Sequence, residues 1–383
     1  MTISLAHSAQ PDIPSGRIAA LVYFWINGAM FGTWASRIPA IKARFDLTEA
    51  MLGLILLYMA VGAVAAFFVT GRLSDTKGAS RVTAIAGIGM AATLPLMAWM
   101  PSPVLLGVAL FLFGALGGSL DLAMNAYGAE VEARRGRSTM SMLHGFWSVG
   151  FGMAAGIGAL AIALDLTPEH HFALMCGVGL CAAVFAQARL VPSLPQPRAV
   201  GAQFVWPTGP VLAVGLFAGF AFVAEGSLLD WVAVFLIETH LATPERGALA
   251  LALFSVVMVV MRLSGDHLIT RVGPRRALML STLLAGLGMA GVGLSPVWWS
   301  VFAAIVPLAA GLALIAPLAF SRAGRAPEAG RAVAAVAICG YGGLLFGPVI
   351  MGFLGEIAGL GTAFVALAAL TLPLIALVRR ATS

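Results

Sequence analysis

Three ionisable side chains stand inside long apolar stretches of this sequence. They are the carboxylic acids Asp121 and Glu225 and the imidazole of His144. An ionisable group inside hydrocarbon costs at least about 2.5–3.5 kcal/mol, so a residue of this kind is a functional candidate by default. Each of the three could bind and release a proton. The sequence therefore predicts proton coupling at Glu225, Asp121 and His144, or binding of a polar ligand there.

Polar and aromatic side chains occur at spacings that place two of them on one face of a helix. The pairs are Asp121 with Asn125, His144 with Trp147, and Asn27 with Trp34, and Tyr341 lies near the internal-repeat position of Trp147. A hydrogen-bonding group beside an aromatic ring suits a solute that itself contains a ring. The predicted substrate-binding set is Asn27, Trp34, Asp121, Asn125, His144, Trp147, Glu225 and Tyr341.

A structural interpretation of the same residues stays open at this stage. Asn27 could join one helix to another by a hydrogen bond, as Asn often does in membrane proteins. Asp121 could pair within its own group of helices, and His144 could be satisfied by a backbone carbonyl. Glu225 could likewise make a hydrogen bond that only stabilises the fold.

The amino-acid composition is typical of an integral membrane protein. Of the 383 residues, 60% are hydrophobic and 10% are charged, and the mean hydropathy is +0.98. A soluble protein has about 25% charged residues, so this chain could not cover its surface in water. A spanning helix needs roughly 20 apolar residues, which leaves room for about twelve spans and no separate catalytic domain. The net charge of +6 is explained by membrane topology, and we expect no nucleic-acid partner.

Hydrophobic runs predict twelve membrane-spanning helices. They cover residues 18–36, 49–70, 82–100, 104–127, 140–164, 171–188, 210–237, 248–268, 277–294, 298–320, 332–354 and 361–378. With the N-terminus in the cytoplasm, all but four of the 22 Lys and Arg residues lie on the cytoplasmic side. The exceptions are Arg37, Lys42, Arg44 and Arg246. This asymmetry obeys the positive-inside rule and predicts that both termini are cytoplasmic.

The chain contains an internal repeat. A shift of 195 residues aligns segment 75–81 with segment 270–276, and the same shift aligns glycine and phenylalanine residues of 145–152 with those of 340–347. Two related halves are common in membrane transporters. The predicted boundaries are a cytoplasmic tail at 1–17, a first half at 18–188, a proline-containing linker at 189–209, a second half at 210–378 and a tail at 379–383.

The segment Gly-Arg-Leu-Ser-Asp-Thr-Lys-Gly-Ala-Ser-Arg at 71–81 resembles the loop motif of the major facilitator superfamily. Segments 34–41, 143–150, 224–231 and 347–356 resemble its bacterial YbjJ-like inner-membrane branch. The resemblance implies an all-α fold of twelve transmembrane helices, arranged as two pseudo-symmetric six-helix bundles around a central cavity. It also implies that spans one, four, seven and ten line this cavity and that the bundles rock to give alternating access.

Two groups of residues are candidates for gating. By resemblance, Gly71, Asp75, Gly78 and Arg81 form the cytoplasmic gate motif. At the other side, Arg37 and Asp230 lie toward the ends of spans one and seven, and an ion pair between them would form only when the outer mouth closes. The alternative is that these two residues are solvated independently.

Two departures from the family pattern accompany these motifs. In the second copy of the loop motif, Thr270 stands where an acid is common and Asp266 stands where Gly is common. Arg262 and Asp266, spaced i, i+4, predict a local ion pair near the membrane boundary. The Gly-Pro pattern of antiporters is not met in span five, which disfavours export.

The resulting hypothesis is a secondary transporter of the bacterial inner membrane that carries a small polar solute by proton symport. The alternative within transport is proton-coupled efflux of drugs or metabolites. An intramembrane enzyme and a non-transporting receptor belong to different classes and find less support, because no nucleophile, phosphate-binding loop or metal-ligand pattern accompanies the ionisable residues. We expect no cofactor and no metal, and a monomer whose partners are the solute, protons and the lipid bilayer.

Overall fold

The computed structural model describes residues 14–136, 139–193, 209–326 and 329–382. Most of the predicted linker 189–209 and of the predicted tail 1–17 lies outside these residues. The first half contains α1 (Pro14–Ala35), α2 (Ile38–Arg44), α3 (Glu49–Lys77), α4 (Ala79–Trp99), α5 (Pro103–Arg135), α6 (Met140–Ala163) and α7 (Pro168–Gln187). The second half contains α8 (Gly209–His240), α9 (Pro244–Val272), α10 (Pro274–Leu294), α11 (Trp298–Ala323), α12 (Ala329–Ala358), α13 (Leu360–Ala369) and α14 (Thr371–Thr382).

The twelve predicted spans are confirmed. Within the described residues, 12 helical segments are long and apolar enough to cross a membrane. The twelfth segment, Leu360–Ala381, consists of α13 and α14, which meet at Leu370. The predicted tail 379–383 is therefore largely the end of α14. The short helix α2 lies between the first two spans, in a segment for which no helix was predicted.

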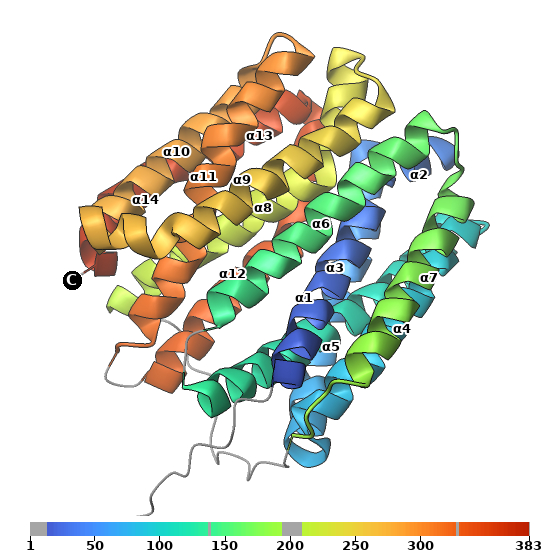
Figure 1. The fold of residues 1–383 in the computed structure, drawn as a ribbon. Helices are drawn as coiled ribbons and strands as arrows, with labels where there is room; N and C mark the ends of the chain where they lie inside the picture. The colour runs from blue at the N-terminus through green and yellow to red at the C-terminus, as the bar shows by residue number, and fades with distance from the viewer. Residues whose placement is uncertain (1–13, 137–138, 194–208, 327–328, 383) are drawn as a thin grey trace, which may run out of the picture.

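The helices form two six-helix bundles that lie side by side (Figure 1). Blue to green helices make up the first bundle, and yellow to red helices make up the second. Contacts between α6 and α9 and between α3 and α12 join the bundles. We call the end of the molecule that carries α2 the α2 end, and the end at which α1 begins and α14 finishes the terminal end.

The predicted repeat is visible in the backbone at two glycines. Gly78 separates α3 from α4 with φ 87° and ψ 139°, and Gly273 separates α9 from α10 with φ 83° and ψ 151°. A residue with a side chain rarely adopts a positive φ of this kind, whereas glycine does so without a steric penalty. The two positions are 195 residues apart in the sequence, so both halves use the same turn between their second and third spans.

Polar side chains determine where several helices begin. The hydroxyl of Thr48 accepts a hydrogen bond from the backbone N–H of Met51, and that of Ser102 accepts one from Leu105, both at 3.3 Å. These caps satisfy backbone groups that have no partner inside the helix. At the start of α6, Glu132 has this role from a distance: its Oε2 accepts from the backbone N–H groups of Thr139 at 2.6 Å and Met140 at 2.9 Å.

Replacing Glu132 with Ala is expected to destabilise the first half by about 1–3 kcal/mol, because two N–H groups at the start of α6 lose a charged acceptor. The free energy of unfolding in an SDS titration, followed by circular dichroism, measures this loss. Glu130→Ala is the matched control, since Glu130 makes a long i, i+4 contact with Arg134 at 3.9 Å. Such a pair contributes about 0.5 kcal/mol or less. Equal effects of the two substitutions would contradict the assignment of Glu132 as a helix cap.

Candidate functional site

Arg262 of α9 connects the two halves of the molecule. Its Nη1 donates a hydrogen bond to Oγ of Ser148 on α6 at 2.7 Å, and its Nη2 lies 3.4 Å from Oε1 of Glu225 on α8. The side chains of Arg262 and Glu225 are 17% and 21% exposed. The candidate carboxylate Glu225 is thus paired with a cation of the neighbouring helix, and that cation also contacts the opposite half.

The predicted partner of Arg262 was a different residue. An i, i+4 pair with Asp266 was predicted, and it stays a prediction because the side chain of Asp266 lies outside the described part of the structure. The described contacts of the guanidinium are to Glu225 and Ser148, because α6 and α8 both pack against α9 and bring in groups that are distant in the sequence. Arg262 and Ser148 were not predicted as site residues. The position of Arg262 inside a span was the signal that could have identified it.

His144 belongs to the same neighbourhood. Its ring contacts Phe24 of α1 edge-on, with 5.2 Å between the centroids, and it lies within electrostatic range of Arg262. Ser148 follows one turn later on α6, and its hydroxyl contacts the backbone carbonyl of His144 at 3.4 Å. The same face of α6 therefore carries a hydroxyl that contacts Arg262 of α9 and, one turn earlier, an imidazole that contacts Phe24 of α1.

A second group of candidates meets around Asp121 of α5. The amide of Asn125 donates to the backbone carbonyl of Asp121 at 2.8 Å and to its Oδ1 at 3.3 Å. Tyr341 of α12 lies within electrostatic range of Asp121. Its ring centroid is 4.5 Å from that of Phe67 and 6.0 Å from that of Phe222. Three aromatic rings, from α3, α8 and α12, thus lie together near a carboxylic acid. Phe67 and Phe222 were not predicted as site residues, because nothing in the sequence distinguishes them from other apolar residues of the spans.

Asn27 is occupied by bonds between helices. Its Nδ2 donates to the backbone carbonyl of Gly117 on α5 at 3.1 Å, and its Oδ1 accepts from Nε1 of Trp147 on α6 at 2.7 Å. Asn27 is 1% exposed. The ring of Trp147 stacks on Phe151 at 5.6 Å. This geometry matches the structural interpretation of Asn27, in which the amide joins α1, α5 and α6.

Trp34 lies apart from the other candidates. It is 1% exposed and packs in the core of the first half near Phe172 of α7, with 6.4 Å between the ring centroids. Its spacing from Asn27 places both residues on one face of α1. Different helices cover this face along its length, because Asn27 contacts α5 and α6 whereas Trp34 lies near α7. Substrate contact at Trp34 therefore has no support in the geometry.

At the α2 end, an ion pair joins the halves. Nζ of Lys42 on α2 lies 2.7 Å from Oε1 of Glu238 on α8 and 3.8 Å from Oε1 of Glu49. Nearby, Oε2 of Glu356 on α12 accepts from the backbone N–H of Ala50 at 2.9 Å. We refer to Lys42, Glu49, Ala50, Glu238 and Glu356 as the α2-end clamp.

The predicted gate pair of Arg37 and Asp230 is not formed in this structure. Nε of Arg37 donates to Nδ1 of His171 at 3.1 Å, and its Nη2 donates to the backbone carbonyl of Leu166 at 2.8 Å. Both partners belong to the first half. Because α2 begins directly after Arg37, the side chain of Arg37 turns toward α7 while Lys42, further along α2, reaches α8. Asp230 is buried on α8.

At the terminal end, the loop motif contacts the segment that follows α7. The backbone N–H of Ser80 donates to Oγ of Ser193 at 3.1 Å, and the backbone N–H of Ser193 donates to Oγ of Ser80 at 2.9 Å. Of the four predicted gate residues, Gly78 forms the turn described above. Gly71 and Asp75 are half-buried and Arg81 is exposed.

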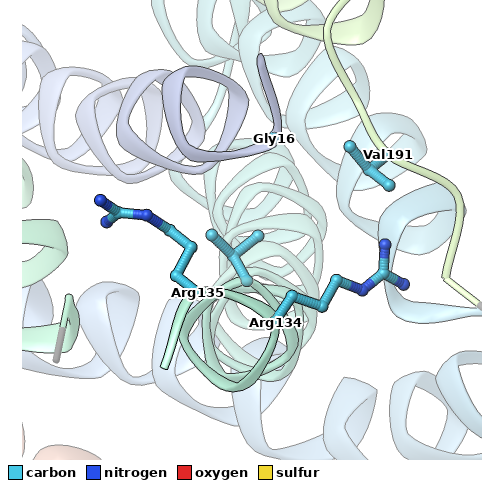
Figure 2. A pocket seen from close by; sticks show the side chains of 5 residues that line it. Gly16, Arg134, Arg135 and Val191 are labelled. Carbon is cyan, nitrogen blue, oxygen red and sulfur yellow. The ribbon is translucent and has the colours of Figure 1, made fainter. Parts of the chain in front are cut away.

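A small hollow lies beside this segment (Figure 2). It is lined by Gly16, Val131, Arg134, Arg135 and Val191. The two arginine side chains leave the last turn of α5 in different directions, and Val191 faces them from the segment after α7. The cavity volume of about 20 Å³ accommodates about one water molecule. This hollow is therefore too small for an organic solute.

Comparisons with known proteins agree with this architecture. The family model of the Major Facilitator Superfamily matches residues 19–325. The chain is 37% identical to the uncharacterized transporter y4wD of Sinorhizobium fredii over 89% of this chain and 91% of the relative. It is 33% identical to an uncharacterized MFS-type transporter of Yersinia pestis over 98% of both chains. The crystal structure of the nucleoside transporter NupG, D323A mutant, has the same fold, with a TM-score of 0.77 at 14% identity over 97% of this chain and 99% of that one. This chain therefore belongs to the Major Facilitator Superfamily and is a membrane transporter rather than an enzyme.

Proposed function

We propose that this transporter carries a small polar solute across the bacterial inner membrane together with a proton, by alternating access between two rigid halves, 18–188 and 210–378. The observation that carries the proposal is the bridge from Glu225 through Arg262 to Ser148. A carboxylate that can accept a proton is here paired with a guanidinium that also holds the opposite half. A change in the charge of Glu225 is thus transmitted directly to a contact between the halves.

Electrostatics links the proton to the solute. Protonation of Glu225 removes the negative charge that balances Arg262. An unbalanced charge inside a span costs at least about 2.5–3.5 kcal/mol. A bound solute supplies new partners for Arg262 and so replaces the charge balance with Glu225, which is how solute binding and protonation of Glu225 are proposed to be linked. His144, near Arg262, and Asp121, beside Tyr341, are the further groups proposed to take part in proton movement.

We place the α2 end on the periplasmic side. The reason is that the positive-inside rule puts the terminal end, which is rich in arginine, in the cytoplasm. In this orientation the α2-end clamp joins the two halves at the periplasmic side. Breakage of the Lys42–Glu238 contact accompanies the opposite state, in which the periplasmic side is open.

Glu225→Gln is expected to abolish the pH dependence of solute binding, since Gln occupies the same volume and cannot take up a proton. A thermal-shift screen of sugars, nucleosides and small organic acids on detergent-purified protein, at mildly acidic and mildly alkaline pH, identifies the solute. The wild type is expected to show a larger shift at acidic pH, and the variant an equal shift at both. Glu245→Gln, in the first turn of α9, is the matched control.

The same solute, added to proteoliposomes that contain a pH-sensitive dye, is expected to drive proton entry with the wild type. Solute uptake without proton movement would contradict symport. If the pH dependence of solute binding is the same in Glu225→Gln as in the wild type, Glu225 is not the coupling group, and Asp121 or His144 is the next candidate.

A further inference from the structure

The guanidinium of Arg262 has donors for a further acceptor besides Ser148 and Glu225. A guanidinium carries more N–H donors than the two contacts to Ser148 and Glu225 use. The contact with Glu225, at 3.4 Å, is longer than the about 2.7–2.9 Å typical of charge-assisted hydrogen bonds. With 17% of its side chain exposed, Arg262 is neither fully buried nor fully engaged. A planar acceptor with two oxygens matches the geometry of the donors that remain.

The surroundings of Arg262 come from three elements. The α6 helix contributes His144 and Ser148, α8 contributes Glu225, and α11 approaches α9 with the apolar side chain of Leu314 at Gly265. The only carboxylate within ion-pair distance of Arg262 among the described side chains is Glu225. Arg262 and Glu225 together carry no net charge.

We propose that the transported solute carries one carboxylate, which Arg262 binds in place of Glu225. This inference rests on the proposed function and specifies its substrate class. The two oxygens of the solute carboxylate accept from the guanidinium in a bidentate geometry, and Glu225 gives up its contact with Arg262. A proton from the aqueous phase binds to the Glu225 carboxylate and forms its O–H bond.

Charge balance links the two events in a ratio of one to one. Counting only the described pair of Arg262 and Glu225, the empty site is neutral, the site with a bound anion alone has one net negative charge, and the site with the anion and one proton is neutral again. A net charge inside a span is unfavourable, so anion and proton bind together. A neutral solute offers no charge to compete with Glu225, and a cationic solute is repelled by Arg262.

Matched pairs of compounds test the assignment on the full-length protein in detergent. Each pair consists of a carboxylate and its neutral counterpart: gluconate with glucitol, glucuronate with glucose, and benzoate with benzyl alcohol. We expect only carboxylates to raise the melting temperature, and more strongly at acidic pH. Neutral members that raise it as much as their carboxylates, or a series in which no carboxylate raises it, would overturn the assignment.

Variants locate the effect at Arg262. Arg262→Gln is combined with Glu225→Gln, so that no unpaired charge remains in the membrane and the protein keeps a neutral pair at this position. The double variant is expected to bind the carboxylate at least about tenfold more weakly than Glu225→Gln alone, which corresponds to about 1.4 kcal/mol. Equal affinity of the two would overturn the role of Arg262. Glu245→Gln, which removes a charge in the first turn of α9 and leaves the Arg262 site intact, is expected to retain carboxylate selectivity.

Failure of this inference is distinguishable from failure of the proposed function. A neutral solute whose binding depends on pH and on Glu225 would reject the carboxylate class and leave symport intact. A carboxylate that requires Arg262 but binds equally at both pH values would reject proton coupling and leave the substrate class intact.

Discussion

Reversing the charge of Lys42 is expected to open the α2 end, and reversing that of Glu238 in the same chain is expected to close it again. The two side chains face each other at 2.7 Å across the boundary between the halves, with Lys42 11% exposed. Lys42→Glu places a third carboxylate beside those of Glu49 and Glu238. The change from attraction to repulsion is expected to shift the equilibrium between closed and open states by about 1–2 kcal/mol, or roughly 5–30-fold.

Spin labels at Ala40 and Leu241 report on this equilibrium. Both positions are exposed and lie at the α2 end, one in each half. The distance distribution between the labels is expected to lengthen in Lys42→Glu and to return to that of the wild type in the combined variant, Lys42→Glu with Glu238→Lys. Failure of the combined variant to restore the distance would show that the ion pair does not close this end.

The control for this experiment is the ion pair of Arg44 and Glu169. These residues lie 3.0 Å apart and resemble the clamp pair in chemistry, but both belong to the first half. Arg44→Glu is therefore expected to leave the distance between the halves unchanged. A lengthening equal to that of Lys42→Glu would mean that net charge at the α2 end, rather than the specific contact, governs the closure.

Gly28→Ala is expected to prevent stable folding, because the backbones of α1 and α6 touch at this position. A Cβ on Gly28 would overlap the backbone carbonyl oxygen of Trp147, and backbone atoms cannot move away by rotation of a side chain. Overpacking of this kind is expected to cost on the order of 3–5 kcal/mol. The same crossing positions Asn27 against Trp147 and carries His144 and Ser148 toward α9, so the loss extends to the candidate site.

Unfolding in SDS, together with the elution profile in mild detergent, measures this effect. Gly156→Ala is the matched control on α6, since no atom lies within 4 Å of the Cβ it would gain. That substitution is expected to be neutral or to stabilise the helix by up to about 1 kcal/mol, because Ala is a better helix former than Gly. A folded Gly28→Ala protein with wild-type stability would mean that α1 and α6 are further apart than described here.

Sequence alone predicted the membrane topology because the signal for a span is local. Twenty or so consecutive apolar residues form a helix in lipid whatever their neighbours are, since no other backbone conformation satisfies its own hydrogen bonds there. The same argument identified Glu225, Asp121 and His144 as ionisable groups within spans. The alignment of the internal repeat placed Gly78 opposite Gly273, and in the structure both glycines have a positive φ.

Partners across helices were decided by the tertiary structure. Helical periodicity reaches only residues three, four or seven positions away, so it paired Arg262 with Asp266 and could not detect Glu225, 37 residues away. The pair of Arg37 and Asp230 was predicted from their places toward the ends of spans one and seven, whereas in the structure Lys42 reaches Glu238, 196 residues away. Such contacts depend on which helices are neighbours and on how closely their backbones approach. Small residues such as Gly28 set these distances, and their effect appears only when two helices meet.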